Sequence, residues 1–585
     1  MYSKHKDALP ENTVYKIREA HTSIGLQMEC SLEKHVDGIY SAYLQDPAGK
    51  WNTAGKGTTE EYCLASAYGE SIEHLCNHFA FDISKVSGEA KHCYGFLRYP
   101  DEQLLPISTV ETVAPAVFAD MASCVGGEGT TDELVEIWQG ILASDTTPFV
   151  PYYDVESGAD VLLPDAVLSK LCGSNGGGSG NTPAEAIGHA LDEAIERYVK
   201  YKIHHDKLTP PTISKEILRQ ISPELFNLIS RIEAEGELKI IVKDASLGKG
   251  FSVICVLVID EVNQRYLSNF GAHPCFEIAL ERCLTELFQD RKCVSELLDR
   301  REMIPWNGAP DSVISGVKNW VSLLRDDIGL LPDSIFGRQT SWEFRPWPII
   351  RDYNNTAGML HQLSVLKDNG FRVFIRNNSF LGFPVFKVYI PFMSLSHQRF
   401  DSRLVSEIRL ADRFDACLLN DATHAEKETI CGCAFSQDSF YLEMLLRHWG
   451  AEDLSILYAA ALFDTGRMQD ALHMLGDTCL REGRFMQRYL QLTLNGSPAG
   501  EREHLLRLFF GENCGVWISA METGNAFDIL REYSLAKGLV RKTSPSQSVA
   551  KAERDLLYSR LKEVFLAYPI QQGESLRAIL SGGAV

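Results

Sequence analysis

Apolar residues over the first 395 positions follow two alternating periods. Short runs rich in β-branched or aromatic residues are typical of strands, and they include GIYSAYL, LKIIVKDASLG, FSVICVLVID, FRVFIRN and FKVYIPF. Segments with helical periodicity lie between these runs. The alternation predicts a mixed α/β (α+β) domain over residues 1–400. Residues 301–350 contain several tryptophans and prolines without a clear period, and we expect an inserted loop and helix there.

Strand-like runs nearly disappear after residue 400, and helical periodicity replaces them in DLSILYAAALFDTG, RMQDALHMLGDTCL and SPSQSVAKAERDLLYSRLKEVFLAYP. This change predicts an all-α domain over residues 401–585. The turn from Asp464 to Arg467 joins two of these helices, and small residues at Ala460 and Ala471 would let the pair pack as one tetratricopeptide-like hairpin. An ordinary helical bundle that caps the first domain explains the same pattern.

An internal repeat is the strongest signal in the chain. GKGTTEEYCLASAYGESIEH from Gly55 matches GSGNTPAEAIGHALDEAIER from Gly178 at a constant offset of 123 residues. In each copy a glycine-containing turn precedes a helix that opens with a threonine and has a glutamate three residues later (Thr58–Glu61 and Thr182–Glu185). This arrangement is typical of a capping box at a helix start.

Both repeated helices carry a pair of glutamates at positions i and i+3, which places each pair on one face. Apolar residues occupy the opposite face of each helix. The polar faces comprise Ser66, Glu70, Glu73 and Asn77 in the first copy, Glu185, Asp192, Glu193 and Glu196 in the second, and Arg282, Glu286 and Gln289 on a third helix within GAHPCFEIALERCLTELFQDR.

These polar faces have two interpretations. Each could be solvated surface, since amphipathic helices usually face water, and Glu185 could serve only the capping box. Repeated helices tend to pack against each other, however, and facing carboxylates then require protonation or an intervening cation, for which oxygen ligands favour Mg²⁺ or Ca²⁺. Arg197 and Arg282 would add forked donors suited to phosphate. The second interpretation predicts a nucleotide site with magnesium.

SNGGGSGNT, at residues 174–182, has the glycine density that lets backbone N–H groups approach an anion at a helix start. It does not match the GxxxxGK[ST] pattern of a P-loop, and it follows no dinucleotide-binding fingerprint. A flexible turn accounts for it equally well. The sequence also shows no Ser-His-Asp set, and we predict no catalytic residue.

The overall composition favours a soluble cytoplasmic protein. A net charge of −21 opposes broad contact with nucleic acid, and no apolar run approaches the roughly 20 residues that a membrane-spanning helix needs. Fifteen cysteines without framework spacing indicate reduced thiols, and the Cys431–Cys433 pair alone is weak support for a zinc or redox site. The sequence does not determine the oligomeric state and is compatible with a homodimer.

On the basis of its motifs, the chain resembles the YcaO family, and specifically the form of that family with a helical, tetratricopeptide-like C-terminal extension. The resemblance covers residues 6–395 through HKDALPENT, GKGTTEEYCLASAYGESIEH, SNGGGSGNTPAEA, LDEAIERYVK, DASLG and FGAHPCFEIALERCLTELFQ. It covers the last third of the chain loosely. The expected fold is therefore a YcaO-like domain with an internal repeat, followed by an all-α domain.

The resemblance implies ATP and Mg²⁺ as cofactors and assigns ligands to both. The metal ligands that it implies are Glu70, Glu73, Glu185, Glu193, Glu196 and Glu286. The nucleotide-binding residues that it implies are Lys6, Thr13, Ser66, Glu73, Asn181, Arg197, Arg282 and Glu286. For Lys6, a solvated chain end is the alternative.

The chain departs from the family pattern at several positions. His74 stands where an arginine often follows the second glutamate. In the segment PFMS, Phe392 departs from the PGM that is usual in the family. The sequence ends in SGGAV without the proline-rich terminus of azoline-forming members. It also contains no fused ubiquitin-activating-like domain. We expect the first departure to weaken one phosphate contact and the last two to argue against ring formation.

The function implied by the resemblance is ATP-dependent activation of an amide in a protein or peptide. For the form with the helical extension, the implied role is accessory to a radical methylthiotransferase that modifies an aspartate of a small-subunit ribosomal protein. One alternative is a cyclodehydratase or thioamide-forming enzyme acting on ribosomal peptides. A second is a nucleotide-switched module that docks a protein partner through its helical extension.

Overall fold

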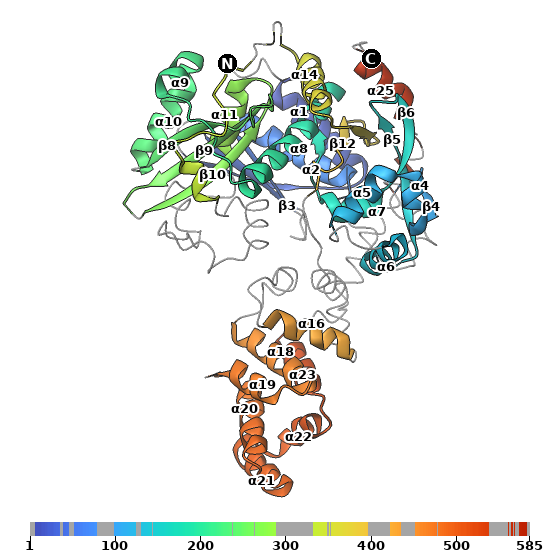
Figure 1. Cartoon of the computed structure of the whole chain (residues 1–585), viewed down its shortest axis with the longest axis vertical. Helices are drawn as coiled ribbons and strands as arrows, with labels where there is room; N and C mark the ends of the chain where they lie inside the picture. Colours follow the sequence, from blue (N-terminus) through green and yellow to red (C-terminus); the bar gives the residue numbers. More distant parts are fainter. Residues whose placement is uncertain are drawn as a thin grey trace.

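The computed structural model of the 585-residue chain has a large mixed α/β part and a separate group of helices (Figure 1). The described residues are 6–35, 39–45, 52–78, 99–124, 130–236, 238–287, 331–347, 353–395, 422–434, 451–537 and 572–581, without 143, 237, 263 and 477, together with 350, 560, 563–564 and 567. Most of residues 301–350, and nearly all of SPSQSVAKAERDLLYSRLKEVFLAYP, lie outside them. The described part of 331–350 holds one 3₁₀ turn, η4 (Asp333–Phe336).

Three antiparallel sheets form the strand layer of the described chain. The first contains β1 (Glu29–Lys34), β2 (Tyr40–Gln45) and β3 (Asn52–Gly57), and another contains β8 (Lys239–Asp244), β9 (Val253–Asp260) and β10 (Arg265–Ala272). The third has the order β4 (Gln103–Pro106), β5 (Thr146–Asp154), β11 (Phe374–Asn377), β12 (Val385–Tyr389) and β7 (Gly177–Ser179), with β6 (Ala159–Pro164) beside β5. The five strand-like runs of the sequence are confirmed as β2, β8, β9, β11 and β12.

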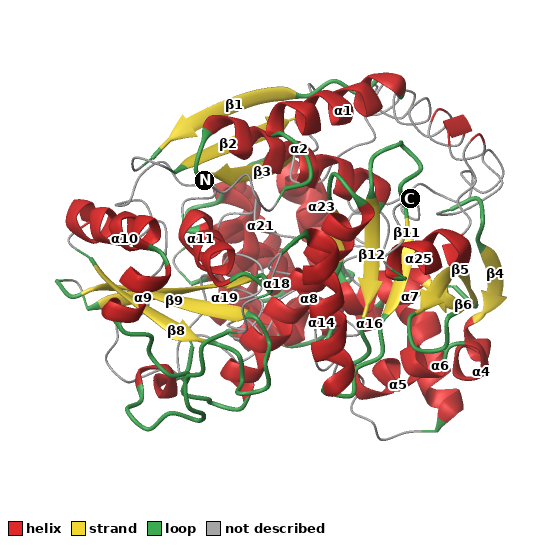
Figure 2. Ribbon diagram, turned by 90° about the horizontal axis from the view of Figure 1, so that it is seen from above, coloured by secondary structure: helices red, strands yellow, loops and turns green. Residues whose placement is uncertain are grey.

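Long helices pack between these sheets, and Figure 2 shows three of them at the centre of the molecule. They are α2 (Glu60–Cys76), α8 (Pro183–His205) and α11 (Phe276–Glu286), with α1 (Pro10–Ser23) against α2 and α14 (Asn355–Asp368) against α8. Their apolar faces are buried as the periodicity predicted: Ile72 is 0% exposed, and so are Ala190 and Cys283. The polar faces of the three helices are directed toward the space between them.

Further helices cover the outer surfaces of the sheets. They are η3 (Ile107–Thr109), α4 (Val110–Val113), α5 (Pro115–Cys124), α6 (Thr131–Leu142) and α7 (Asp165–Cys172), which lie near the six-stranded sheet, and α9 (Lys215–Ile221) and α10 (Pro223–Gly236), which lie near the β8–β10 sheet.

Beyond residue 421 every described element is helical. The elements are α16 (His424–Ala434), α18 (Ala451–Asp464), α19 (Met468–Leu475), α20 (Arg481–Leu494), α21 (Ala499–Phe510), η5 (Glu512–Cys514), α22 (Gly515–Glu522), α23 (Phe527–Lys537) and α25 (Gln572–Leu580). Helices α18 and α19 form the predicted hairpin, with Ala460 and Ala471 fully buried. The helical C-terminal region is confirmed, whereas its tetratricopeptide-like character and the boundary at residue 400 stay predictions.

The last helix, α25, packs against the α/β part. Leu576 is fully buried beside β5 and β11, and the Gln572 side chain accepts a hydrogen bond from Asn377 N (2.7 Å) and donates one to Asn377 O (2.9 Å). Within the described ranges, no helix has the length and apolar character needed to cross a membrane. The eleven cysteines whose side chains the structure describes are free thiols.

Candidate nucleotide and metal site

One strand–helix unit occurs three times, once in each sheet. In the units β3–α2, β7–α8 and β10–α11, a strand glycine lies against the backbone of the helix that follows it, at the residues eight and twelve positions later. A Cβ at Gly55 would lie 2.4 Å from Cys63 O, at Gly178 2.3 Å from Ala186 O, and at Gly271 2.5 Å from Ala279 O. Only glycine permits this close approach of strand and helix.

The third unit was missed as a repeat by sequence comparison. Gly271 is followed by neither a second glycine nor a threonine cap, so the turn that identified the first two copies is absent. The signal that remains is a glutamate fifteen positions after the glycine, at Glu70, Glu193 and Glu286. The residues eleven positions after the three glycines also correspond to one another, and they are Ser66, His189 and Arg282.

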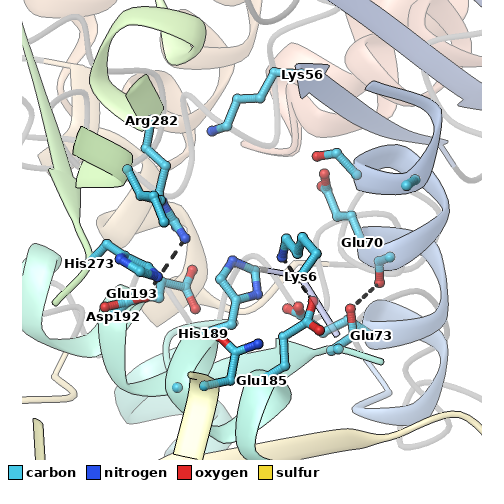
Figure 3. Close-up of a pocket in the computed structure, with 18 of the residues that line it drawn as sticks. Lys6, Lys56, Glu70, Glu73, Glu185, His189, Asp192, Glu193, His273 and Arg282 are labelled. Atoms are coloured by element: carbon cyan, nitrogen blue, oxygen red, sulfur yellow. Dashed lines mark hydrogen bonds and ion pairs between the residues drawn. The ribbon is translucent and has the colours of Figure 1, made fainter. Parts of the chain in front are cut away.

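The three helices enclose a cavity of about 560 Å³, and Figure 3 shows the side chains that project into it. Its volume lies within the usual range for small-molecule sites. The structure brings all twelve predicted site residues to its wall: Lys6, Thr13, Ser66, Glu70, Glu73, Asn181, Glu185, Glu193, Glu196, Arg197, Arg282 and Glu286. The described polar faces therefore meet at one cavity, where Glu70, Glu193 and Glu286 stay partly exposed. Gln289, predicted on the third face, lies outside the described residues.

The acids of α2 lie beside those of α8. Glu73 is 8% exposed and sits against Gly177, where a Cβ would come within 2.6 Å of its Oε1. Burial, followed by repulsion from Glu193 and Glu70, raises the pKa of Glu73 well above its usual range. Burial also raises the pKa of Glu193, with Arg197 opposing it. These acids are crowded together as the sequence predicted.

Backbone amides and cations fix the orientation of the α8 carboxylates. Glu193 accepts a hydrogen bond from Gly176 N (3.1 Å) and pairs with Arg197 (2.7 Å), while Glu196 accepts one from Ala272 N (3.0 Å). The first contact links α8 to the glycine-rich segment, and the last links α8 to β10. Glu196 is thus positioned by a strand 76 residues away, whereas Glu193 is positioned by its own helix and by the segment just before it.

Glu185 belongs to a polar cluster with the N-terminal segment. Its carboxylate accepts hydrogen bonds from Lys6 Nζ (3.0 Å), Asp7 N (3.1 Å) and Asn181 Nδ2 (3.2 Å). Although burial opposes ionisation, Lys6 and Asp7 N hold the pKa of Glu185 below its usual value. Thr13 joins through its hydroxyl, which donates to Asn181 Oδ1 (2.7 Å).

These contacts change three details of the sequence interpretation. Glu185 does not close a capping box, because its carboxylate binds Lys6 and Asp7 N; Thr182 still caps α8 by accepting from Glu185 N (3.2 Å). Lys6 is an ion-pair partner of Glu185 rather than part of a solvated chain end. The cap of α2 is Thr59, one residue later than predicted.

Thr58, the residue predicted as that cap, instead donates a hydrogen bond from its hydroxyl to Glu281 Oε1 (3.2 Å). The contact joins the turn after β3 to α11. Burial raises the pKa of Glu281 to about 7, with the Thr58 hydrogen bond opposing it.

Several cavity residues were not assigned by the sequence. They are Lys56, His189, Asp192, Lys200, His273, Tyr353 and Gln362. Lys56 forms an ion pair with Glu286 across two units, and His189 projects between the acids of α2 and Arg282 (Figure 3). Burial, followed by Arg282 and Lys6, lowers the pKa of His189 well below its usual value, so its ring is neutral at pH 7.

The donor set fits a magnesium-bound nucleotide. Crowded carboxylates with raised pKa values provide the negative charge that a divalent cation would neutralise. Among the described residues, no three His, Cys, Asp or Glu side chains converge closely enough to hold a metal by themselves. Mg²⁺ is usually held by one or two carboxylates together with phosphates and water. Arg197, Arg282, Lys6 and Lys56 line the same cavity, and their cationic groups are of the kind that binds phosphate.

Comparison with known proteins agrees with this description of a nucleotide- and metal-binding protein. The family model described as YcaO cyclodehydratase, ATP- and Mg²⁺-binding, matches residues 54–394. The chain therefore belongs to the YcaO family, and the predictions of family and of ATP and Mg²⁺ as cofactors are confirmed.

Two curated proteins are similar to the chain. An uncharacterized protein of Haemophilus influenzae is 29% identical over 398 residues. The ribosomal protein S12 methylthiotransferase accessory factor YcaO of Escherichia coli is 28% identical over 394 residues. Each alignment covers 66% of this chain and 65% of the relative, so it spans slightly less than two thirds of either relative's length.

Among solved structures, YcaO from Methanopyrus kandleri bound with AMPPCP and Mg²⁺ is similar at 17% identity and a TM-score of 0.42. That likeness covers 67% of this chain and 94% of the other.

Proposed function

We propose that this chain binds Mg-ATP between α2, α8 and α11 and uses it to activate an amide of a protein or peptide. One observation carries the proposal: the acids and arginines predicted from three separate helices line a single cavity. Glu70, Glu73, Glu193, Glu196 and Glu286, with Glu185, would hold the metal. Lys6, Thr13, Ser66, Asn181, Arg197 and Arg282 would hold the nucleotide.

The chemistry follows from charge and position. Mg-ATP, when bound, would transfer its terminal phosphoryl group to the oxygen of an amide to which a nucleophile has added, with release of ADP, so that the oxygen could then leave as phosphate. The arginines and the metal-bound carboxylates orient the phosphates and balance their charge, which is the main protein contribution in phosphoryl transfer.

For the acceptor, we infer the methylthiolation pathway: the chain acts as an accessory factor for modification of an aspartate in a small-subunit ribosomal protein, beside a radical methylthiotransferase. The E. coli relative, named as the S12 methylthiotransferase accessory factor, supports this assignment, as does the helical region. The alternative is a cyclodehydratase or thioamide-forming enzyme on a ribosomal peptide, which the description of the family model favours.

A third alternative is a nucleotide-switched docking module. Tight Mg-ATP binding without phosphate release in the presence of any acceptor would favour this alternative over an enzyme.

Calorimetric titration of Mg-ATP tests the nucleotide site. We expect Glu193→Ala and Arg197→Ala each to weaken binding at least tenfold, because each removes a charged group from the cavity wall. Lys202→Ala is the matched control, since Lys202 lies on the same helix and pairs with Asp206 outside the cavity. Unchanged binding in folded Glu193→Ala and Arg197→Ala proteins would refute the site.

The acceptor is tested in an E. coli strain that lacks its own YcaO. We expect wild-type chain, but not the Glu193→Ala variant, to restore the methylthiolated mass of ribosomal protein S12. Full expression without any mass change would exclude S12 of that organism as an acceptor and would favour the peptide-modifying alternative.

A further inference from the structure

Arg282 enters the cavity from α11 with its guanidinium facing α8. In the described chain, its guanidinium donates no hydrogen bond to protein, and its nearest ion-pair contact is Asp192 Oδ2 at 3.9 Å from Nη1 (Figure 3). That distance is too long for a hydrogen bond but close enough for electrostatic attraction. Arg282 is therefore attracted toward one carboxylate while its N–H donors are left for a ligand.

Asp192 is itself held rigidly. It is 3% exposed, and its Oδ1 accepts a hydrogen bond from Nε2 of Gln362 on α14, a residue that is also 3% exposed. The orientation of the Gln362 amide follows from this contact, because a flipped amide would set its oxygen against a carboxylate oxygen. Gln362 Oε1 faces Gly188, where an added Cβ would lie 3.9 Å away.

We propose that Asp192, oriented by Gln362, is a positioning residue that holds Arg282 in place for the phosphates of Mg-ATP. This inference rests on the proposed function. Asp192 acts through Arg282, whereas Glu193 beside it faces Arg197 and the acids of α2. Adjacent acids on α8 thereby have different tasks, one orienting a cation and the other belonging to the metal side of the cavity.

The direction in which Asp192→Asn changes the affinity for Mg-ATP separates this positioning role from a general effect of negative charge. If Asp192 were only another negative charge near the phosphates, Asp192→Asn would tighten Mg-ATP binding. If Asp192 positions Arg282, the same substitution weakens binding, because an amide donor then faces the guanidinium donors. Asparagine has nearly the shape of aspartate, so the two residues differ at this position in charge and hydrogen bonding alone.

The experiment is calorimetry of Mg-ATP and of adenosine with Asp192→Asn, Arg282→Ala and the double variant. We expect Asp192→Asn to weaken Mg-ATP about tenfold, to leave adenosine unchanged, and to have no further effect once Arg282 is alanine. Gln362→Met, which keeps the side-chain shape, should cause a smaller loss of Mg-ATP affinity than Asp192→Asn. Asp206→Asn, at the end of the same helix, is the matched control.

Three results would overturn the inference: tighter Mg-ATP binding by Asp192→Asn, losses that add in the double variant, or an equal loss for adenosine. Failure of the proposed function is distinguishable, because Arg282→Ala would then leave Mg-ATP binding intact. Circular dichroism shows whether Asp192→Asn folds. If it does not, Gln362→Met and Arg282→Ala form a double-mutant cycle for Mg-ATP binding in its place. Additive losses of affinity in that cycle also overturn the inference.

Discussion

Crowding of the buried carboxylates would couple proton release to the binding of metal at the proposed site. Burial and the neighbouring Glu193 and Glu70 raise the pKa of Glu73, so the ligand-free protein retains a proton there above the pH at which an ordinary glutamate ionises. A divalent cation favours the ionised form and lowers that pKa. Binding of Mg-ATP should therefore release protons, and its affinity should rise with pH through the raised pKa.

Calorimetry in two buffers of different ionisation enthalpy measures this proton release. We expect net release by wild type and less by Glu73→Gln, which has no proton to lose. Glu261→Gln is the control, since Glu261 is 68% exposed and pairs only with surface Lys239. Binding by wild type without net proton release would show that the acids are ionised before the metal binds.

The linkage also affects folding. A carboxyl whose folded pKa lies above its unfolded value destabilises the fold as pH rises from the unfolded pKa through the folded one. Glu73→Gln should remove that loss of stability in the metal-free protein.

Residue identities at the site were partly readable from sequence for a physical reason. Glu70, Glu73, Glu193 and Glu196 share helical faces, and the period of a helix reveals a face without knowledge of the fold. Lys56, Tyr353 and Gln362 reach the cavity from a strand and from the segment around α14. Their proximity depends on pairing between distant segments, which no local pattern encodes.

At the scale of elements, close strand–helix packing sets the position of each polar face. Gly178→Ala would place a Cβ 2.3 Å from Ala186 O and 2.6 Å from Ala190 N, both backbone atoms of α8. Because backbone cannot yield like a flexible side chain, we expect a loss of roughly 1–3 kcal/mol in stability and weaker Mg-ATP binding. Scanning calorimetry and nucleotide titration measure the two effects.

Gly500→Ala supplies the contrast for this prediction. Gly500 lies in α21 with open space around its Cα, so alanine there should stabilise the helix by up to about 1 kcal/mol. Equal effects of Gly178→Ala and Gly500→Ala would show that the strand–helix contact is not constrained. From sequence, two copies of this unit were predicted as a glycine-containing turn followed by a capped helix, whereas the structure has strands β3 and β7 at those glycines. The β10–α11 copy was missed as a repeat because it keeps only one glycine.

Over the whole molecule, the helical region is attached to the α/β part at more than one point. The chain leaves the α/β part after β12, and α25 returns to it, with Leu576 buried against β5 and β11 and Gln572 bonded to the Asn377 backbone. Arg560 also donates to Ile24 O (3.1 Å). Helical periodicity predicted the helices, but the return of the last one rests on contacts across some 200 residues and was not predicted.

The return of α25 makes the stability of the α/β part depend on the end of the chain. Leu576→Ala removes a fully buried side chain, and we expect a loss of about 2–5 kcal/mol together with faster hydrogen exchange in β11. Leu508→Ala, at a position 68% exposed on α21, should change neither. Because α25 and the cavity lie against the same sheet, bound Mg-ATP should slow the exchange of β11 in wild type. If Leu576→Ala instead accelerated exchange only within α16–α23, α25 would belong to the helical region alone, and the two parts would not be coupled through it.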